Sequence, residues 1–402
     1  MLKILLNNLI KKGTLRVIHA NGAKKIYQGK EPGPDITIKI HNKKTERLLS
    51  INPSLTLGET FMDGGITIES GDIYDFLELC IMNIGWGQDE HWLQKLLSKS
   101  RRLTRRIAQH NPISKSKSNV AHHYDLSDTL YDLFLDKDRQ YSCAYYMNEN
   151  ESLETAQNNK KRHITAKLLL DKNHEVLDIG SGWGGLGLYI AEKTGAKVTG
   201  ITLSEEQLKV SNKRAENSDF SNRINFRLQD YRNENNLFDR IVSVGMFEHV
   251  GVGYYKNFFE KIKELLKDDG VALIHTIGRA DGPGSTNPWL AKYIFPGGYT
   301  PSLSEIVPII EKVGLYVTDI EILRLHYAST LRAWRRNFNV NRKKIKELYD
   351  EKFCRMWDFY LAGCENAFRY GGQLNFQIQL AKKQDTVPLT RDYIMEWEQK
   401  HI

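Results

Sequence analysis

From residue 120 onward, apolar segments of strand length alternate with segments of helical periodicity. Five segments are strand candidates, and a helical pattern follows each one: EVLDIG (175–180), AKVTGITL (196–203), INFRLQD (224–230), FDRIVSVGM (238–246) and GVALIHTIG (270–278). Alternation of this kind predicts parallel strands joined by helical crossovers. We therefore expect an α/β fold built on a doubly wound, mostly parallel sheet.

A glycine-rich loop follows the first of these strands. The stretch VLDIGSGWGG carries Asp178 at the strand end and then four glycines, which permit a tight turn and the close approach of a ligand. In open parallel sheets, ligands bind beyond the carboxyl ends of the strands. The pattern alone also fits a dinucleotide. Asp178 would repel a pyrophosphate, and the next strand ends in GITLS without an acid for a nicotinamide ribose, which favours S-adenosylmethionine.

The N-terminal region has a different pattern. Apolar residues at helical spacing predict a first amphipathic helix at Leu2, Leu5, Leu6, Leu9 and Ile10. The segment LRVIHANGAKKIYQG predicts a hairpin with an Asn-Gly turn, and DITIKIH predicts a strand. FMDGGITIESGDIYDFLELCIMNIG predicts a turn, a strand and a buried helix.

We divide the chain accordingly. Residues 1–105 are expected to form a small α/β domain that docks on lipid. Residues 106–119 are expected to form a linker, which follows an arginine-rich segment of the chain. Residues 120–402 are expected to form the catalytic domain. A chain of 402 residues is long enough for two or three domains.

Charge and cysteine content limit the possible partners. The formal net charge of +8 fits an anionic partner such as a membrane surface or a nucleic acid, without choosing between them. Four cysteines without metal-ligand spacing predict reduced thiols, no zinc site and a cytoplasmic location. We find neither a signal peptide pattern nor the roughly 18 apolar residues of a membrane-spanning helix. We therefore expect any membrane contact to be peripheral.

The chain resembles the cyclopropane fatty acid synthases, a family that includes the mycolic acid cyclopropane synthases. The matching segments include YSCAYY, VLDIGSGWGG, GITLSEEQ, MFEHVG, ALIHTIGR, YIFPGGYTPS, HYASTLRAW and FYLAGCENAFR, in the family's order. GETFMDGGI resembles the N-terminal domain of the bacterial fatty acid enzymes, which the mycolic acid enzymes lack. The resemblance implies a class I S-adenosylmethionine-dependent methyltransferase fold, phospholipid acyl chains as substrate, a homodimer, and peripheral association with the inner face of the bacterial membrane.

The resemblance also implies a mechanism. An alkene attacks the sulfonium methyl, a carbocation forms, and a bound bicarbonate removes a proton so that the cyclopropane ring can close. The residues implied to hold bicarbonate are Cys143, Glu248, His275, Tyr327 and the carbonyl of Ile277. A carboxylate beside bicarbonate would repel it, so we expect a protonated Glu248 or a cationic His275. The resemblance offers a second thiol, Cys364, as a catalytic candidate, although core packing accounts for it more simply.

The resemblance assigns the donor-binding residues as well. The carboxylate end of the donor is implied to contact Tyr141 and Ser142. The loop residues Gly180, Ser181 and Gly182 are implied to lie against the rest of the donor. The ribose hydroxyls are implied to contact Thr202 and Gln207, with Leu203 and Ser204 beside them. The adenine is implied to lie against Asp230 and Tyr231. Ser181 stands where the family commonly has cysteine.

Other functions are open to this fold. Amine N-methyltransferases share much of the catalytic domain but usually lack the full Cys, Glu, His and Tyr set. Methyl-branching enzymes share the first chemical step and then reduce the product. Base-methylating enzymes carry an NPP[YF]-type motif after the fourth strand, where this chain has MFEHVG, so we expect no nucleic-acid partner. A lipid-binding protein with a degenerate site is disfavoured by the intact site residues.

Overall fold

The computed structural model describes residues 2–85 and 127–402. These residues belong to two compact units, Met1–Arg105 with Gly284–Pro296 and Ala328–Gln373, and Arg106–Pro283 with Gly297–Tyr327 and Leu374–Ile402. Two segments of the predicted catalytic domain therefore cluster with the N-terminal residues. The predicted linker, 106–119, lies outside the described residues, so the predicted boundaries stay a prediction.

The first unit contains a small mixed sheet with helices on one face. Its sheet order is β2-β1-β3-β4, with β1 and β2 antiparallel, β1 and β3 parallel, and β3 and β4 antiparallel. The N-terminal elements are α1 (Leu2–Leu9), β1 (Lys12–Ile18), β2 (Lys24–Gln28), β3 (Glu31–Ile40), α2 (Lys43–Ile51), α3 (Pro53–Met62), β4 (Ile66–Ser70) and α4 (Ile73–Ile84). The predicted first helix, hairpin, strands and buried helix are all present.

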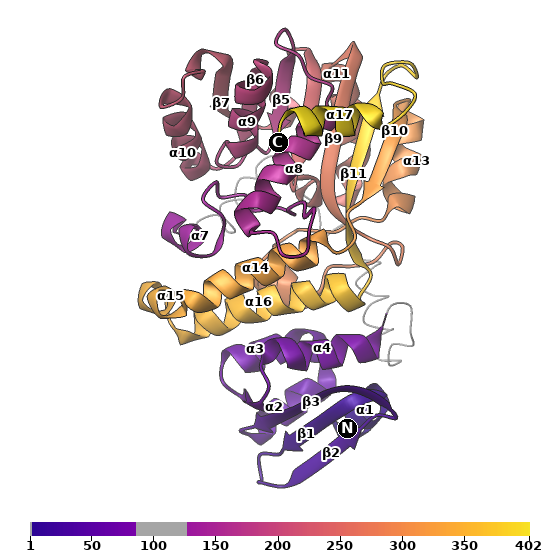
Figure 1. The fold of residues 1–402 in the computed structure, drawn as a ribbon. Helices are drawn as coiled ribbons and strands as arrows, with labels where there is room; N and C mark the ends of the chain where they lie inside the picture. The colour runs from indigo at the N-terminus through magenta and orange to yellow at the C-terminus, as the bar shows by residue number, and fades with distance from the viewer. Residues whose placement is uncertain (1, 86–126) are drawn as a thin grey trace. The chain divides into compact units, whose positions relative to one another are not determined.

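Four later helices complete the first unit: α12 (Pro288–Tyr293), α14 (His326–Val340) from Ala328 onward, α15 (Arg342–Leu348) and α16 (Glu351–Tyr370). Apolar contact explains their place there, because Trp289 of α12 lies 4.7 Å from Phe359 of α16 between ring centroids. Ala362 of α16 belongs to the same buried cluster as Leu15 and Leu79 of the N-terminal elements. Helix α4 packs along α16 within this unit (Figure 1).

The second unit is built on a seven-stranded sheet of order β10-β11-β9-β8-β5-β6-β7. Strands β7, β6, β5, β8 and β9 are joined in parallel pairs, and β10 with β11 is antiparallel. The strands are β5 (Glu175–Ile179), β6 (Lys197–Thr202), β7 (Ile224–Leu228), β8 (Phe238–Val244), β9 (Leu266–Arg279), β10 (Tyr316–Ile322) and β11 (Gln373–Ala381). The expected doubly wound sheet and its five predicted strands are confirmed, but the prediction of a helix after INFRLQD is wrong, because only the 3₁₀ turn Tyr231–Asn233 lies between β7 and β8.

Helices lie on both faces of this sheet (Figure 1). They are α7 (Asp128–Phe134), α8 (Leu153–Lys167), α9 (Gly185–Thr194), α10 (Glu205–Glu216), α11 (Tyr255–Leu265), α13 (Leu303–Val313) and α17 (Asp392–Lys400). Short 3₁₀ turns occupy Ser221–Arg223, Tyr231–Asn233, Phe247–His249 and Val252–Tyr254. In the part of the chain that the structure describes, no helix combines the length and apolar character needed to cross a bilayer.

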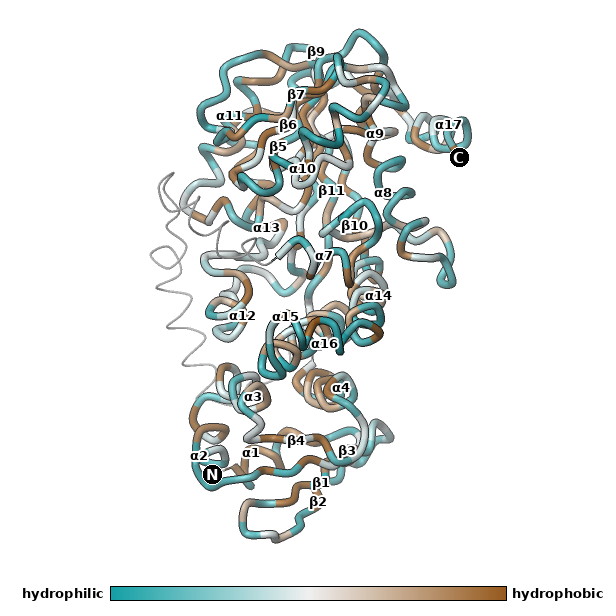
Figure 2. Tube along the Cα trace, turned by 90° about the vertical axis from the view of Figure 1, so that its left-hand side faces the viewer, coloured by the Kyte–Doolittle hydropathy of each residue, from teal (hydrophilic) through white to brown (hydrophobic). Residues whose placement is uncertain are grey.

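Alternate strand residues supply two separate cores. In β9, Ala272 and Ile274 join a cluster that also contains residues of α11 and α13, whereas Leu273 joins a cluster with residues of α8 and α9. This division follows from the period of two along a strand, and it explains why the strand sequences are almost continuously apolar. The brown colour along the large sheet in Figure 2 marks these strands, while polar α10 is pale to teal.

Candidate functional site

The sheet order reverses at β5, which lies between β6 and β8. Crossovers leave β5 in opposite directions at this position, so a crevice opens at the carboxyl ends of the strands. The glycine loop lies at that crevice. Gly180 and Gly182 have φ angles of 84° and 54°, conformations that side chains rarely adopt. A Cβ atom on Gly182 would meet no heavy atom within 4 Å, so this backbone is open to a ligand.

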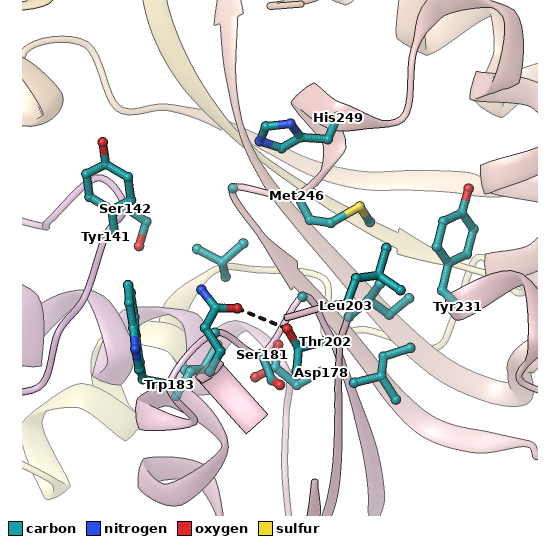
Figure 3. A pocket seen from close by; sticks show the side chains of 18 of the residues that line it. Tyr141, Ser142, Asp178, Ser181, Trp183, Thr202, Leu203, Tyr231, Met246 and His249 are labelled. Atoms are coloured by element: carbon teal, nitrogen blue, oxygen red, sulfur yellow. Dashed lines mark hydrogen bonds between the residues drawn. The ribbon is translucent and has the colours of Figure 1, made fainter. Parts of the chain in front are cut away.

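A pocket occupies the crevice, and we call it the glycine-loop pocket. Ten of the eleven predicted donor-binding residues line it: Tyr141, Ser142, Gly180, Ser181, Gly182, Thr202, Leu203, Gln207, Asp230 and Tyr231. Tyr141 and Ser142 lie on one side of the pocket and Tyr231 on the opposite side (Figure 3). The pocket is therefore elongated between the residues predicted for the two ends of the donor.

The remaining predicted residue, Ser204, has a structural place instead. Its hydroxyl caps α10 by accepting a hydrogen bond from the Gln207 backbone N–H at 3.3 Å. Thr202 Oγ1 donates to Gln207 Oε1 at 2.9 Å, the dashed line in Figure 3, and accepts from the Ser204 backbone N–H at 3.2 Å. Thr202 thus fixes the amide of Gln207, and the ribose contact assigned to both residues stays a prediction.

The carboxylate of Asp230 is held by its own neighbour. Asp230 is buried, and its two oxygens accept from Arg232 Nε at 2.8 Å and from a terminal guanidinium nitrogen at 2.6 Å. Burial raises the pKa of Tyr231 well above its ordinary value, so its phenol stays neutral. These two residues offer a ligand a neutralised carboxylate and an aromatic edge.

Helix α8 holds the loop that carries Tyr141, Ser142 and Cys143. Gln157 donates from Nε2 to the carbonyls of Gln140 and Ser142, at 3.1 and 3.0 Å. Lys160 donates from Nζ to Gln140 Oε1 at 2.6 Å and to Ser142 Oγ at 2.8 Å. Among the described residues this loop pairs with no strand, so these side chains hold it in place of a backbone ladder.

Glu248 follows β8 in a 3₁₀ turn and faces the end of β9. Its Oε1 accepts a hydrogen bond from the Ile277 backbone N–H at 2.6 Å. Its Oε2 is buried and has no hydrogen-bond partner among the described residues. Burial raises the pKa of Glu248 to about 7, so a substantial fraction is protonated at neutral pH. Of the two protonation states that we predicted for this site, the structure favours a protonated Glu248.

His275 is neutral and is engaged at both ring nitrogens. Gln377 donates from Nε2 to Nδ1 at 3.1 Å, and the Asn375 amide lies 2.6 Å from Nε2. Lys167 fixes the orientation of Gln377 by donating to its Oε1 at 2.8 Å. Nδ1 is therefore the acceptor and Nε2 carries the proton, which pairs with the Asn375 oxygen after a half-turn of that amide. Burial lowers the pKa of His275 well below its ordinary value, which disfavours the cationic alternative.

A chain of buried charges continues from this histidine. Glu321 accepts from Lys167 and from His163 Nε2, the latter at 2.7 Å. Glu398 of α17 accepts from His163 Nδ1 at 2.9 Å. The ring of Tyr145 stacks on His163, with centroids 4.2 Å apart. These contacts tie the YSCAYY segment, α8, β10 and α17 into one polar network.

The other predicted catalytic residues lie in both units. Cys143 is buried in the second unit beside Ser142, and burial raises the pKa of its thiol. Tyr327 is buried at the start of α14. Cys364 lies in α16 of the first unit, where burial raises its pKa to about 12. A thiol with that pKa is not an activated nucleophile. The roles assigned to these residues stay predictions.

Several pocket residues escaped the sequence analysis. Gln140, Lys160, Trp183, Met246 and His249 all line the glycine-loop pocket. Lysine in the polar segment LETAQNNKKRHITAK is typical of an exposed helix, and nothing in its spacing distinguishes Lys160 from Lys161. Met246 and His249 lie inside the motif MFEHVG, so that motif was the sequence signal that could have identified them as pocket residues.

Comparison with known proteins identifies the family. Residues 112–378 match the family model described as mycolic acid cyclopropane synthetase, and residues 1–84 match a domain of unknown function. The chain is 35% identical to a probable fatty acid methyltransferase of Pseudomonas putida, over 89% of this chain and 91% of that protein. It is 37% identical to the cyclopropane-fatty-acyl-phospholipid synthase of Escherichia coli K12, over 83% of this chain and 84% of that protein.

A solved structure agrees with these relatives. Mycolic acid cyclopropane synthase CmaA1 complexed with SAH and CTAB superposes with a TM-score of 0.62 and 33% identity, covering 66% of this chain and 97% of that chain. The likeness confirms the class I methyltransferase fold. The chain belongs to the mycolic acid cyclopropane synthetase family and is an S-adenosylmethionine-dependent methyltransferase.

Proposed function

We propose that this enzyme transfers a methylene group from S-adenosylmethionine to the cis double bond of unsaturated phospholipid acyl chains. The observation that carries the proposal is the alignment with the Escherichia coli phospholipid enzyme, which extends over most of both chains. In the balanced reaction, the alkene forms a bond to the donor methyl as the sulfur–carbon bond breaks. The transferred methyl then loses a proton, and its electron pair closes the three-membered ring.

We propose bicarbonate as the base, as the family resemblance implies. When bound, bicarbonate supplies a proton acceptor beside the transferred methyl. Glu248 fits such an anion, because its protonated carboxyl donates a hydrogen bond and its Oε2 has no partner among the described residues. His275 fits less directly, since an anion would have to replace Asn375 at Nε2. The thiol of Cys143 stays neutral and donates to the Ala144 carbonyl, with sulfur and oxygen 3.4 Å apart, so an anion would have to replace that carbonyl as the acceptor.

The lipid assay tests both proposals. Full-length enzyme is incubated with S-adenosylmethionine and vesicles of dioleoyl phosphatidylglycerol, and the acyl methyl esters are analysed by mass spectrometry. We expect acyl chains that are heavier by one CH₂ and that no longer react as alkenes. A saturated methyl-branched chain, or methylation of an amine with untouched lipid, would refute the proposed function. Buffer stripped of bicarbonate should slow the reaction and added bicarbonate should restore it, whereas an unchanged rate would refute the proposed base.

We also propose that the N-terminal residues bring the enzyme to the inner face of the bacterial membrane. Residues 1–51 contain eleven Lys and Arg and three Asp and Glu, so they account for the whole net charge of +8. Lys24 and Lys25 of edge strand β2 have no ion-pair partner among the described residues, and neighbouring Ile26 is 55% exposed. Desolvation and the nearby Lys3 ammonium lower the pKa of Lys25. Uncompensated cations beside an exposed apolar side chain suit an anionic lipid surface.

Vesicle sedimentation tests this docking. Changing Lys24 and Lys25 together to Glu should weaken binding to phosphatidylglycerol vesicles by about 10-fold or more at low salt, at roughly 1 kcal/mol for each basic residue near the surface. The matched control changes exposed Lys209 and Lys213 of α10 to Glu, which alters the net charge equally. Equal loss in both variants would show that net charge alone governs binding and would refute a specific docking region.

The homodimer implied by the resemblance is part of the proposal. Sedimentation velocity of the purified chain should give the mass of two copies at micromolar concentration. A monomer across the accessible concentration range would refute it.

A further inference from the structure

The lining of the glycine-loop pocket includes two opposite charges that are not paired with each other. Lys160 of α8 and Asp178 of β5 both line the pocket, and no salt bridge within 4.0 Å joins them in the described part of the chain. Lys160 is 0% exposed and Asp178 is 2% exposed. Buried charges are costly unless another group completes their hydrogen bonds, so each side chain requires a partner.

Lys160 has one N–H left for that partner. Its ammonium carries three donors, and two of them are used by Gln140 Oε1 and Ser142 Oγ, both uncharged oxygens. Burial lowers the pKa of Lys160 to about 8, and the carboxylates of Asp136 and Asp138 act against that fall, so the ammonium stays mainly cationic at neutral pH. The group that best completes this site is an anion that reaches the pocket beside Ser142.

Asp178 has the complementary need. Its Oδ2 is buried and has no hydrogen-bond partner among the described residues. Burial raises the pKa of Asp178 to about 7, and Lys160 acts against that rise. A cation that donates a hydrogen bond to Oδ2 would complete this carboxylate. The pocket therefore presents one cation and one anion to its ligand.

An α-amino acid zwitterion matches this pair of charges. We propose that Lys160 is the donor-binding residue that receives the carboxylate at the amino-acid end of S-adenosylmethionine, while Asp178 receives its ammonium. The inference rests on S-adenosylmethionine as donor and is independent of which lipid accepts the methylene. The rival explanation is structural, with Lys160 serving only to fix Gln140 and Ser142 of the loop.

Two ligands that differ in one group separate these explanations. Calorimetry gives the Kd of S-adenosylmethionine and of decarboxylated S-adenosylmethionine, which keeps the ammonium and sulfonium but lacks the carboxylate. Wild-type enzyme should bind S-adenosylmethionine about 10- to 100-fold more tightly, the range for a charge-assisted hydrogen bond. Lys160→Met should abolish this preference and leave the Kd of the decarboxylated ligand within about 2-fold.

The control is Lys161→Met, one position along the same helix, where the ammonium contacts Asp138 at 2.7 Å and does not line the pocket. It should keep the preference for the carboxylate. Equal weakening of both ligands by Lys160→Met would show a structural role and overturn the proposal. Should Lys160→Met fail to fold, the wild-type comparison keeps the proposal falsifiable, because equal affinity for the two ligands refutes carboxylate recognition. No lipid is present, so failure of the proposed lipid chemistry would leave this result unchanged.

Discussion

Glu321→Gln removes the carboxylate on which two buried cations converge. Lys167 and His163 both donate to Glu321, and their side chains are only 2% and 6% exposed. The hydrogen bonds and charges of these two groups overcome the effect of burial and lower the pKa of Glu321 from 4.5 to about 2. Glutamine is close to glutamate in size, so the substitution tests the charge rather than the packing.

The pKa difference sets the magnitude. A difference of about 2.5, at about 1.36 kcal/mol for each pKa unit, corresponds to about 3.4 kcal/mol of folding free energy. The Glu321 side chain is 31% exposed, so solvent screening reduces this to roughly 2 kcal/mol. Because the folded-state pKa is depressed, the stabilisation is complete above pH 4.5 and is lost as the pH falls toward 2.

Urea unfolding of wild type and Glu321→Gln at a series of pH values measures this term. We expect the variant to be less stable by roughly 2 kcal/mol at pH 7, with the gap narrowing below about pH 4.5. Glu311→Gln is the matched control, since Glu311 is exposed on α13 and forms no ion pair among the described residues. A gap that stays constant from pH 7 to pH 3.5, or one no larger than in the control, would refute the electrostatic reasoning.

Three further predictions concern the site and its glycine loop. Glu248→Leu, which removes the hydrogen-bond donor that a protonated carboxyl provides, should lower turnover by about 100-fold or more while the Kd of S-adenosylhomocysteine stays within about 2-fold; unchanged turnover would contradict the assigned role. With bicarbonate saturating, wild-type turnover should fall as the pH rises through about 7, because Glu248 loses the proton that it offers to the anion; a rising profile would argue against that protonation state. Gly184→Ala should lower the free energy of unfolding by roughly 1–3 kcal/mol, since φ is 84° and a Cβ atom would lie 2.7 Å from Phe226. Gly253→Ala is the control, because a Cβ atom there meets no atom within 4 Å. Equal melting temperatures of the two variants would refute this strain.

The sheet and most of the donor site were predictable because they follow short-range patterns. Strands β5, β6, β8 and β9 are rich in apolar residues and each is followed by an α-helix, so that part of the alternation was visible without any tertiary information. Strand β7 reads INFRL and is followed only by the 3₁₀ turn Tyr231–Asn233. The motifs VLDIGSGWGG and GITLSEEQ fall at strand ends, where the fold brings Ser181 and Thr202 to one pocket. Only Ser204 among these residues turned out to cap a helix instead.

The rest depended on contacts that cross long sequence distances. Strand β11 reads QLNFQIQLA, and its alternating amides at Asn375, Gln377 and Gln379 look like a solvent-facing edge, yet all three are at most 1% exposed. They are buried because His275 and Lys167, far away in sequence, supply their partners. Long-range pairing of this kind leaves no local signal, so neither the last two strands nor the neutral state of His275 could be inferred from the sequence.

Helix α8 carries a buried polar stripe that includes Gln157, Lys160, His163 and Lys167. An apolar helix in its place would tolerate small rotations, because non-directional apolar contacts can rearrange at a small cost in free energy. Here a change of one residue in register turns every side chain by about 100° and breaks contacts to the loop, to β11 and to α17 in the same event. Insertions and deletions within this helix should therefore abolish the activity of the enzyme. A redesign for other donors would have to change the residues that contact α8 rather than α8 itself.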